Sequence, residues 1–395
     1  MSDQPGLRLM LVAGEPSGDE LGAGLLRELR ALSPAGIEAF GVGGAAMARL
    51  GHKSLFPMHE LSVMGVAEVL PRLLNLRKRI AQTAAMALRE RPDALITIDS
   101  PDFNFRVAAR VRRQNPGIPI LHYVAPQVWA WRRGRARKMA RFIDHLLALL
   151  PFEPPIFAEA GLACTFVGHP AIERGAAPQA GAEFRRRHNI PAEAPLLAVL
   201  PGSRHSETSR LLPVFGQAIA MLVGALPDLH LFCASVPGVA SEVTAAAASW
   251  PANVILTRDA AEKVAGFAAC DAAIAASGTV SLELAVTQTP HVIAYRVNPL
   301  TAMIARRVLK ISHVNLINLV VNETVIPELL QESCTAANLT GAVLPLLQAP
   351  RPSLAAETQR AGMRRALGEL GQAFEPPSRR AARAVQEFIE KSKLR

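Results

Sequence analysis

Short apolar runs alternate with helical patterns along most of this 395-residue chain, and no other feature constrains its fold as much. Runs that are apolar at nearly every position are typical of parallel strands, because helices cover both faces of such a sheet. The first part of the chain is therefore predicted to be a doubly wound α/β domain. Its expected strands lie within residues 7–14, 37–43, 93–99, 118–125, 145–150 and 164–168.

A second alternation follows a polar stretch rich in Ala, Pro and Arg around residues 171–195. Its expected strands lie within residues 196–203, 229–235, 253–257, 270–278 and 291–295, and only helical patterns follow Thr340. We predict two Rossmann-like domains, residues 1–172 and 173–345. We expect residues 346–395 to be helices that pack back on the first domain or on a partner subunit. Two such sheets facing across a cleft would bind ligands in the loops after their strands.

Composition narrows the choice of partner. The formal charge of +10 and the pI near 10.1 indicate an anionic partner, such as nucleic acid, a phosphorylated metabolite or an anionic membrane surface. Nucleic acid is the least favoured, because the few aromatic residues do not alternate with basic ones. No apolar run reaches the ~18 residues that span a bilayer, so any membrane contact is expected to be peripheral. The four scattered cysteines are typical of buried, reduced thiols in a cytoplasmic protein.

The segment "AGEPSGD" (residues 13–19) is a glycine turn between an expected strand and an expected helix. Such a turn usually binds phosphate, yet this one lacks a P-loop lysine and carries Glu15 and Asp19, which repel phosphate. Two interpretations stay open. Ser17 or Asp19 caps the helix, or the carboxylates and the hydroxyl bind the hydroxyl groups of a sugar.

A second polar loop, "DSPDFN" (residues 99–104), directly follows a buried strand. Partial removal from water suits Asp99 to general base catalysis, whereas Asp102 is better explained as a helix cap. Asn104 is a further candidate substrate ligand. The spacing is not that of a metal-dependent sugar transferase, so neither a metal nor another cofactor is expected.

Two further stretches of the first domain are candidate contact surfaces. In "HYVAPQVWAWRRGRARKMARF" (residues 122–142), Tyr123 and Trp129 precede a cluster of arginines that suits an anionic acceptor, although a solvated basic helix is the commoner case. In residues 61–80, a helix would place apolar residues on one face and basic residues off it, as in a helix lying on a membrane. A surface helix packed on the sheet is the more common explanation of this second pattern. The apolar face consists of Val66, Val69, Leu70, Leu73 and Leu74.

Two loops of the second domain are typical of a phosphate site. "LPGSRHSE" places Arg204 at a helix start, where a guanidinium and the helix N-terminus favour a pyrophosphate. "SGTVSLE" places Ser277, Gly278 and Thr279 at another helix start, with Glu283 one turn later, where a carboxylate suits a ribose diol. Together they favour a nucleoside diphosphate site over simple capping.

Ten motifs occur in the order found in the lipid-A-disaccharide synthase family, from about residue 10 to about residue 332, and the chain resembles that family. They are "AGEPSGD", "GVGGAAM", "LSVMGVAEVL", "DSPDFN", "YVAPQVWAWR", "LPFE", "FVGHP", "LPGSR", "SGTVSLE" and "VIPELLQ". The resemblance implies a metal-independent, inverting glycosyltransferase with the GT-B fold. Its donor would be UDP-2,3-diacylglucosamine and its acceptor 2,3-diacylglucosamine 1-phosphate, known as lipid X. Its products would be a β-1′,6-linked disaccharide 1-phosphate and UDP.

The resemblance also implies roles for particular residues. Asp99 would be the general base for the acceptor 6-hydroxyl, and Glu15 and Ser17 would position the sugar or the base. Asn315 matches a family asparagine near the donor, although Val314 stands where the family often has proline. The UDP group would contact Arg204, Ser277, Gly278, Thr279 and Glu283, and the residues Glu328 and Gln331 follow in a matching segment.

The family works at the cytoplasmic surface of the inner membrane, so the resemblance implies peripheral contact with anionic lipid. A homodimer is compatible with the last helices. Two alternatives differ in class: another GT-B enzyme that uses a UDP-sugar, such as an epimerase or a cell-wall transferase, and a noncatalytic membrane- or nucleic-acid-binding protein. The first would not need the apolar face of residues 66–74, and the second would leave Asp99 and both glycine loops without a function.

Overall fold

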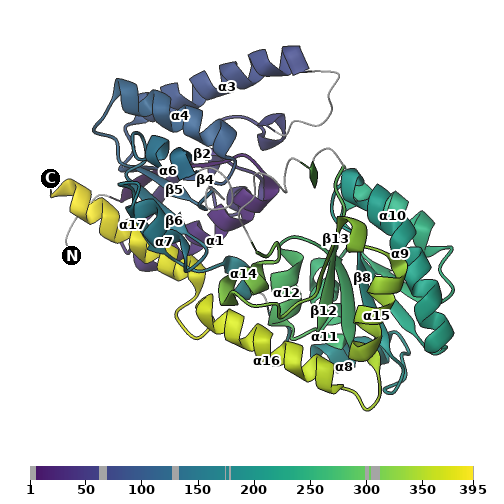
Figure 1. Cartoon of the computed structure of the whole chain (residues 1–395). Coiled ribbons are helices and arrows are strands. Elements are labelled where there is room, and N and C mark those ends of the chain that lie inside the picture. The colour runs from purple at the N-terminus through teal and green to yellow at the C-terminus, as the bar shows by residue number, and fades with distance from the viewer. Residues whose placement is uncertain are drawn as a thin grey trace. The chain divides into compact units, whose positions relative to one another are not determined.

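The computed structural model of the chain describes residues 6–61, 69–126, 133–173, 175–177, 179–298, 302–303 and 312–394, without the side chains of residues 69–73 and 133. The chain divides into two compact units (Figure 1). The first contains residues 1–170 and 374–395, and the second contains residues 171–373. Of the expected C-terminal helices, one therefore lies in the second unit and the last lies in the first.

The first unit is built on a seven-stranded sheet with the order β3-β2-β1-β4-β5-β6-β7. Every pair of neighbouring strands is parallel. The central strands β1 and β4 consist mostly of apolar residues, and from Leu9 onward in β1 and throughout β4 these residues are buried, as expected of parallel strands between helical layers. The strands are β1 (Leu7–Ala13), β2 (Ile37–Val42), β3 (Lys53–Ser54), β4 (Ala94–Ile98), β5 (Ile120–Tyr123), β6 (His145–Ala148) and β7 (Ala163–Phe166).

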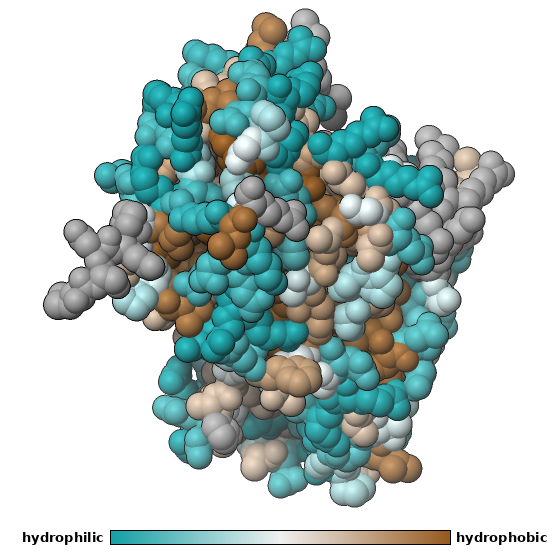
Figure 2. All heavy atoms as spheres, turned by 90° about the vertical axis from the view of Figure 1, so that its left-hand side faces the viewer, coloured by the Kyte–Doolittle hydropathy of each residue, from teal (hydrophilic) through white to brown (hydrophobic). Residues whose placement is uncertain are grey.

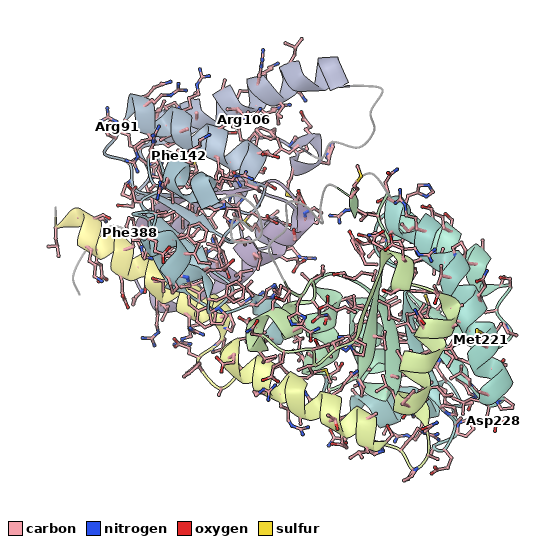
Figure 3. The ribbon with its side chains drawn as sticks, in the orientation of Figure 1. Arg91, Arg106, Phe142, Met221, Asp228 and Phe388 are labelled. Carbon is pink, nitrogen blue, oxygen red and sulfur yellow. The ribbon has the colours of Figure 1, made fainter. Side chains whose placement is uncertain are left out.

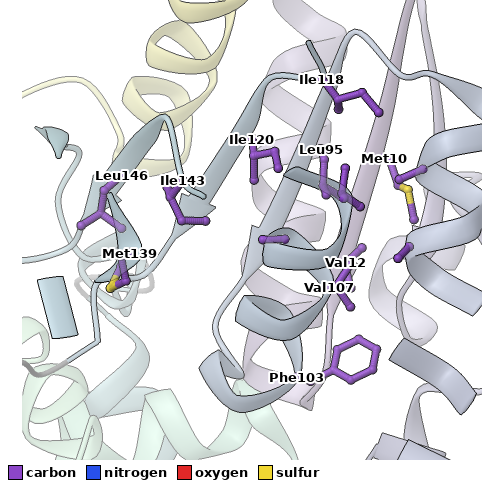
Figure 4. Packing of buried hydrophobic residues seen from close by; sticks show 14 of the residues in the cluster. Met10, Val12, Leu95, Phe103, Val107, Ile118, Ile120, Met139, Ile143 and Leu146 are labelled. Atoms are coloured by element: carbon purple, nitrogen blue, oxygen red, sulfur yellow. The ribbon is translucent and has the colours of Figure 1, made fainter. Parts of the chain in front are cut away.

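Helices cover both faces of this sheet. Met10 and Val12 pack with Phe103 and Val107 of α4 in one core cluster (Figure 4). Since side chains alternate along a strand, the buried Leu9 and other alternate residues of β1 face the opposite layer. The helices of the first part of the chain are α1 (Pro16–Leu32), α2 (Ala45–Ala48), α3 (Val69–Glu90), α4 (Pro101–Gln114), α6 (Arg133–Met139) and α7 (Glu153–Ala158).

Helix α17 (Pro377–Lys393) completes the first unit from the far end of the sequence and packs along α1. Its buried residues include Ala381, Val385 and Ile389, which recur at helical spacing. Arg380 donates a hydrogen bond of 2.9 Å to the carbonyl of Phe166, and Lys393 forms an ion pair of 2.8 Å with Asp93. Polar side chains cover most of the face shown in Figure 2, where hydrophobic residues form small separate patches.

The second unit repeats the plan with a six-stranded sheet in the order β10-β9-β8-β11-β12-β13. Its neighbouring strands are again parallel. The strands are β8 (Leu196–Leu200), β9 (His230–Ala234), β10 (Asn253–Thr257), β11 (Ala272–Ala276), β12 (His291–Tyr295) and β13 (Glu328–Leu330). The helices are α8 (Ala180–Arg187), α9 (His205–Ala225), α10 (Ala240–Ala247), α11 (Ala260–Ala269), α12 (Val280–Val286), α14 (Leu316–Val321), α15 (Ala336–Leu347) and α16 (Leu354–Glu369).

Helix α9 is, among the described residues, the one helix that is long and apolar enough to cross a membrane by length and composition alone. Its residues Leu211, Phe215 and Ile219 are buried in a cluster with Val199 of β8 and Val343 of α15. Met221, on its outer side, is 47% exposed and is labelled in Figure 3. The apolar character of α9 is therefore explained by the core of the second unit.

Two parallel α/β sheets confirm the predicted fold class. Strands β3 and β13 were not expected, because they are short edge strands without an apolar run. All four cysteines are free, and three of them are buried. Burial raises the pKa of the Cys233 thiol to about 12, which keeps it protonated and unreactive near neutral pH.

A fully buried histidine joins three elements of the second unit. His291, the first residue of β12, donates from Nδ1 to the carbonyl of Thr289, 3.0 Å away, so its Nε2 must accept from the Ser281 hydroxyl at 2.7 Å. The backbone N–H and carbonyl of His291 both bond the amide group of Gln359 on α16. Burial lowers the pKa of His291 from 6.5 to about 4, so the imidazole is neutral in the folded chain.

This buried histidine should make the stability of the second unit depend on pH. Between pH 6.5 and 4 the unfolded chain binds a proton at His291 that the folded chain does not, so stability falls as the pH falls. We expect a loss of about 2 kcal/mol from pH 7.5 to pH 5, measured by hydrogen exchange of the β8, β11 and β12 amides.

Replacement of the histidine itself tests this assignment. His291→Asn should flatten the pH dependence while lowering stability at pH 7.5. Equal protection of these amides at pH 7.5 and pH 5 in the unmodified protein would contradict the role assigned to His291.

Candidate functional site

The loops after β1 and β4 meet at one edge of the first sheet, because these strands are neighbours and parallel. Ser17, in the first turn of α1, donates a hydrogen bond of 3.3 Å from its hydroxyl to Oδ2 of Asp99. Glu15 precedes α1 and is exposed, and its side chain does not cap the helix. All three predicted catalytic residues therefore lie at this edge of the first sheet.

The backbone around Asp99 is held in an uncommon conformation. Asp99 and Ser100 both have left-handed φ angles, 53° and 42°, and the Asp99 N–H donates to the carbonyl of Tyr123 at 2.9 Å. Val124, which follows β5, has a φ of 83°, which is strained for a β-branched residue. Strained residues persist where the surrounding structure fixes them, commonly at functional sites.

Two predicted substrate ligands of this region are fully buried. Asn104 is 0% exposed, and its Nδ2 donates to the carbonyls of Val12, Ile98 and Asp99 at 3.3, 3.0 and 2.7 Å. Tyr123, at the end of β5, is also 0% exposed. The third predicted ligand, Trp129, lies outside the described residues.

The acidic glycine turn holds a neighbouring loop of the protein itself. Asp19 is buried and accepts three backbone N–H groups, those of Gly44 and Ala46 at 2.8 Å and that of Met47 at 3.2 Å. It thereby satisfies the free amides at the start of α2. Of the two open interpretations, the one in which Ser17 or Asp19 caps α1 is wrong, because the capping position of α1 is Glu15, which makes no side-chain cap bond.

The expected capping role of Asp102 is also wrong. Helix α4 begins at Pro101, so Ser100 occupies the position before it, and no side-chain bond caps the helix. The Asp102 side chain is 94% exposed and lies 3.6 Å from the guanidinium of Arg135. Asp102 is thus a solvated neighbour of the site and has no structural task in the turn.

In the second unit, the loop after β8 leads Arg204 to the start of α9. Gly202 has a φ of 113°, and a Cβ atom there would lie 2.4 Å from Oε2 of Glu207, so the turn requires glycine. That carboxylate accepts the Ser203 N–H at 2.9 Å. The Arg204 side chain is 72% exposed, and its Nη1 lies 3.6 Å from Glu207. A guanidinium at a helix N-terminus can bind an anionic group.

The loop after β11 lies beside it, since β8 and β11 are neighbours. Gly278 and Thr279 are exposed and Ser277 is half-buried, so backbone amides and hydroxyls are available at the start of α12. Glu283 does not have a free carboxylate, because its Oε2 lies 2.6 Å from Nζ of Lys263. Any ligand of Glu283 would share it with this lysine.

The remaining residues that were predicted to lie near the sugar donor make hydrogen bonds within the protein. Asn315 caps α14 with Oδ1, which accepts the Ile317 N–H at 2.8 Å, and its Nδ2 donates to Ser281 at 2.6 Å. Glu328 accepts the backbone N–H groups of Val314 at 2.8 Å and of Asn315 at 3.1 Å. The substitution of valine for proline at position 314 thus leaves an N–H that Glu328 binds.

Gln331 has a left-handed φ of 52° at the end of β13. Its side-chain oxygen accepts the Val297 N–H at 3.4 Å. Sequence analysis did not single out five residues that support these loops, namely Lys263, Ser281, His291, Asn318 and Glu207. Ser281 and Glu207 lie within the motifs "SGTVSLE" and "LPGSRHSE", but the motifs do not show that these side chains bind His291 and the Ser203 N–H. The partners of Lys263, His291 and Asn318 are brought near by the fold.

The apolar segment is described only in part. Val66 lies outside the described residues, and Val69, Leu70 and Leu73 belong to α3 while their side chains lie outside the description. Leu74 is 65% exposed, one turn before the exposed Arg77 and Lys78. Among the described residues, no group of three or more His, Cys, Asp or Glu side chains could hold a metal ion.

Comparison with protein families gives one match that spans nearly the whole chain. The family model described as lipid-A-disaccharide synthetase matches residues 9–373. A lipid-A-disaccharide synthase of Rhodospirillum centenum is 51% identical over 385 residues, which cover 98% of this chain and 95% of the relative. Another, from Paramagnetospirillum magneticum, is 48% identical and covers 98% of each chain.

Solved structures with low sequence identity share the fold. A UDP-GlcNAc 2-epimerase from Neisseria meningitidis, solved with UDP-GlcNAc bound, has a TM-score of 0.61 at 12% identity, covering 98% of this chain and 100% of its own. MurG from Acinetobacter baumannii has a TM-score of 0.58 at 15% identity, with the same coverage. These likenesses support the two-domain α/β fold that was predicted.

Proposed function

Because the chain belongs to the lipid-A-disaccharide synthetase family, we infer that it is a glycosyltransferase that makes the lipid A disaccharide. The observation that carries this conclusion is identity near one half over almost the full length of both chains. The proposed donor is UDP-2,3-diacylglucosamine, and the proposed acceptor is lipid X. The products are the β-1′,6-linked disaccharide 1-phosphate and UDP.

The proposed reaction is a single displacement. Asp99 removes the proton from the acceptor 6-hydroxyl as that oxygen bonds to the anomeric carbon of the donor, and the bond from this carbon to the UDP oxygen breaks. The hydrogen bond from Ser17 favours one orientation of the Asp99 carboxylate at this edge, which supports the role. The exposed Glu15 at the same edge suits a sugar hydroxyl.

The proposed diphosphate contacts are the loops after β8 and β11. Arg204 supplies positive charge, and the segment Ser277–Thr279 supplies amides and hydroxyls at the start of α12. This pairing suits a leaving group that gains negative charge as the glycosidic bond breaks. Asn315, Glu328 and Gln331 bind backbone N–H groups of the second unit. These bonds favour a role in holding the loops near the proposed donor site and not in direct contact with the donor.

The proposed membrane contact lies on the outer side of α3, α4 and α6. Helices α3 and α4 pack together, and Arg135 of α6 reaches Asp102 of α4. The outer side of α4 carries the exposed Arg106, Arg110 and Arg113, of which Arg106 is labelled in Figure 3. These exposed cations of α4, together with the exposed Leu74 of α3 and the exposed Arg77 and Lys78 one turn after it, favour a bilayer with anionic lipid as the partner.

Replacement of the proposed base tests the catalytic assignment. Asp99→Asn should lower the rate of disaccharide formation by about 10²- to 10⁴-fold, because the amide cannot accept the proton. Product formation from the two lipid substrates, followed as UDP release and disaccharide, is the measurement.

Asp102→Asn is the matched control, since it removes an exposed carboxylate from the same loop and should leave the rate unchanged. A folded Asp99→Asn protein with near-normal turnover would exclude Asp99 as the base. Turnover of UDP-N-acetylglucosamine in place of the acylated donor would favour the soluble UDP-sugar enzymes instead.

Replacement of Arg204 tests the diphosphate contact. Arg204→Ala should weaken UDP binding by about 10- to 10²-fold, because a charge-assisted hydrogen bond is lost, and Arg204→Lys should fall between. Titration calorimetry with UDP measures the effect. Arg186→Ala, an exposed change on α8, is the control, and equal UDP affinity in all four proteins would exclude Arg204 as a phosphate ligand.

Vesicle binding tests the membrane contact. Arg106→Ala with Arg110→Ala and Arg113→Ala should weaken partitioning onto vesicles with anionic lipid by roughly 10²-fold, at about 1 kcal/mol per cation. Arg186→Ala with Arg187→Ala and Arg258→Ala removes the same charge from the second unit and should have little effect. Equal losses in both triple variants would show that only net charge matters.

A further inference from the structure

The left-handed turn at Asp99 and Ser100 is held by contacts on several sides. The Asp99 N–H donates to the carbonyl of Tyr123 on the neighbouring strand. The Ser100 carbonyl accepts the backbone N–H groups of Phe103 and Asn104 at 3.1 and 3.0 Å. A Cβ atom at Gly14 would lie 2.6 Å from the Ser100 hydroxyl, so the loop after β1 packs closely against the turn.

Three backbone carbonyls, one in the turn and two beside it, accept hydrogen bonds from the same side chain. The carbonyls of Val12, Ile98 and Asp99 converge on Nδ2 of Asn104. The shortest of these bonds, 2.7 Å, is the one to Asp99. This bond holds the peptide group that leads from Asp99 to Ser100, and with it the backbone from which the Asp99 side chain extends.

The burial of Asn104 argues against direct contact with a ligand. The residue is 0% exposed and has the core residues Phe103 and Val107 beside it on α4. Its Nδ2 is occupied by the bonds that tie the end of β4 to the end of β1, and its Oδ1, which has no partner among the described residues, is buried as well, so a substrate could reach neither atom without moving the turn. The side chain faces backbone carbonyls and not the exposed edge where Ser17 lies.

We infer that Asn104 is a positioning residue that aims the Asp99 carboxylate by holding the Asp99–Ser100 turn to the ends of β1 and β4. This inference rests on the proposed function, because it needs Asp99 to be the general base. Loss of the amide leaves the substrate contacts in place but lets the base move. A displacement near 1 Å at a reacting group can lower a rate by about 10²-fold.

The kinetic test separates positioning from substrate binding. Asn104→Ala should lower kcat by about 10²-fold while KM changes little. Asn104→Asp keeps the shape but turns an oxygen toward the carbonyls, and it should lower kcat at least as much. Val111→Ala, at the other end of α4 and equally buried, should lower the melting temperature without lowering kcat.

The decisive measurement is the double variant. If Asn104 acts through Asp99, Asn104→Ala should cost nothing further in an Asp99→Asn background. Multiplying losses, or a raised KM with normal kcat, would overturn the inference. Normal kcat in Asn104→Ala together with an inactive Asp99→Asn would overturn it while sparing the general base. A near-normal rate in Asp99→Asn would instead remove the proposed base, and with it any positioning role.

Discussion

Burial of both faces of each sheet confines the polar chemistry of this chain to the ends of its strands. The strands β1, β4, β8 and β11 are buried and almost wholly apolar, so they offer no side chain to a polar ligand. The loops that follow them carry the polar groups of the candidate site, such as the Asp99 carboxylate, the Ser17 hydroxyl and the Arg204 guanidinium. Since neighbouring parallel strands end at the same edge, residues far apart in sequence, such as Ser17 and Asp99, become hydrogen-bonded partners.

Both units fix their loops with buried side-chain amides and carboxylates. In the first unit, Asp19 accepts hydrogen bonds from three backbone N–H groups, and Asn104 donates to three backbone carbonyls. In the second, Asn318 accepts the N–H groups of Val325 and Ile326 and donates to Glu328. Each such group satisfies several backbone atoms that a turn leaves unpaired, which is why a single substitution there has a high energetic cost.

The fold and the location of the candidate site were predictable from the sequence, but the tasks of several polar residues were not. Continuous apolar runs predicted the long strands. Asp99 could be chosen as a candidate site residue because it directly follows one of these strands. Asp19, by contrast, looked like a ligand or a cap of α1, and its partners begin 25 residues later at Gly44. Glu283 was predicted to suit a ribose diol, and its ion pair with Lys263, 20 residues earlier, could not be read from the motif. Such pairings are decided by tertiary contacts, which spacing in the sequence does not encode.

Helix α17 has a consequence for the order in which the chain is made. It packs along α1, where Arg379 lies 3.9 Å from Glu28, and it is synthesised after the entire second unit. A nascent chain on the ribosome therefore carries a first unit whose α1 surface stays uncovered until the whole second unit has been made. During that interval the surface of α1 is open to chaperones. A fragment that ends at residue 170 lacks α17, so its α1 surface stays uncovered.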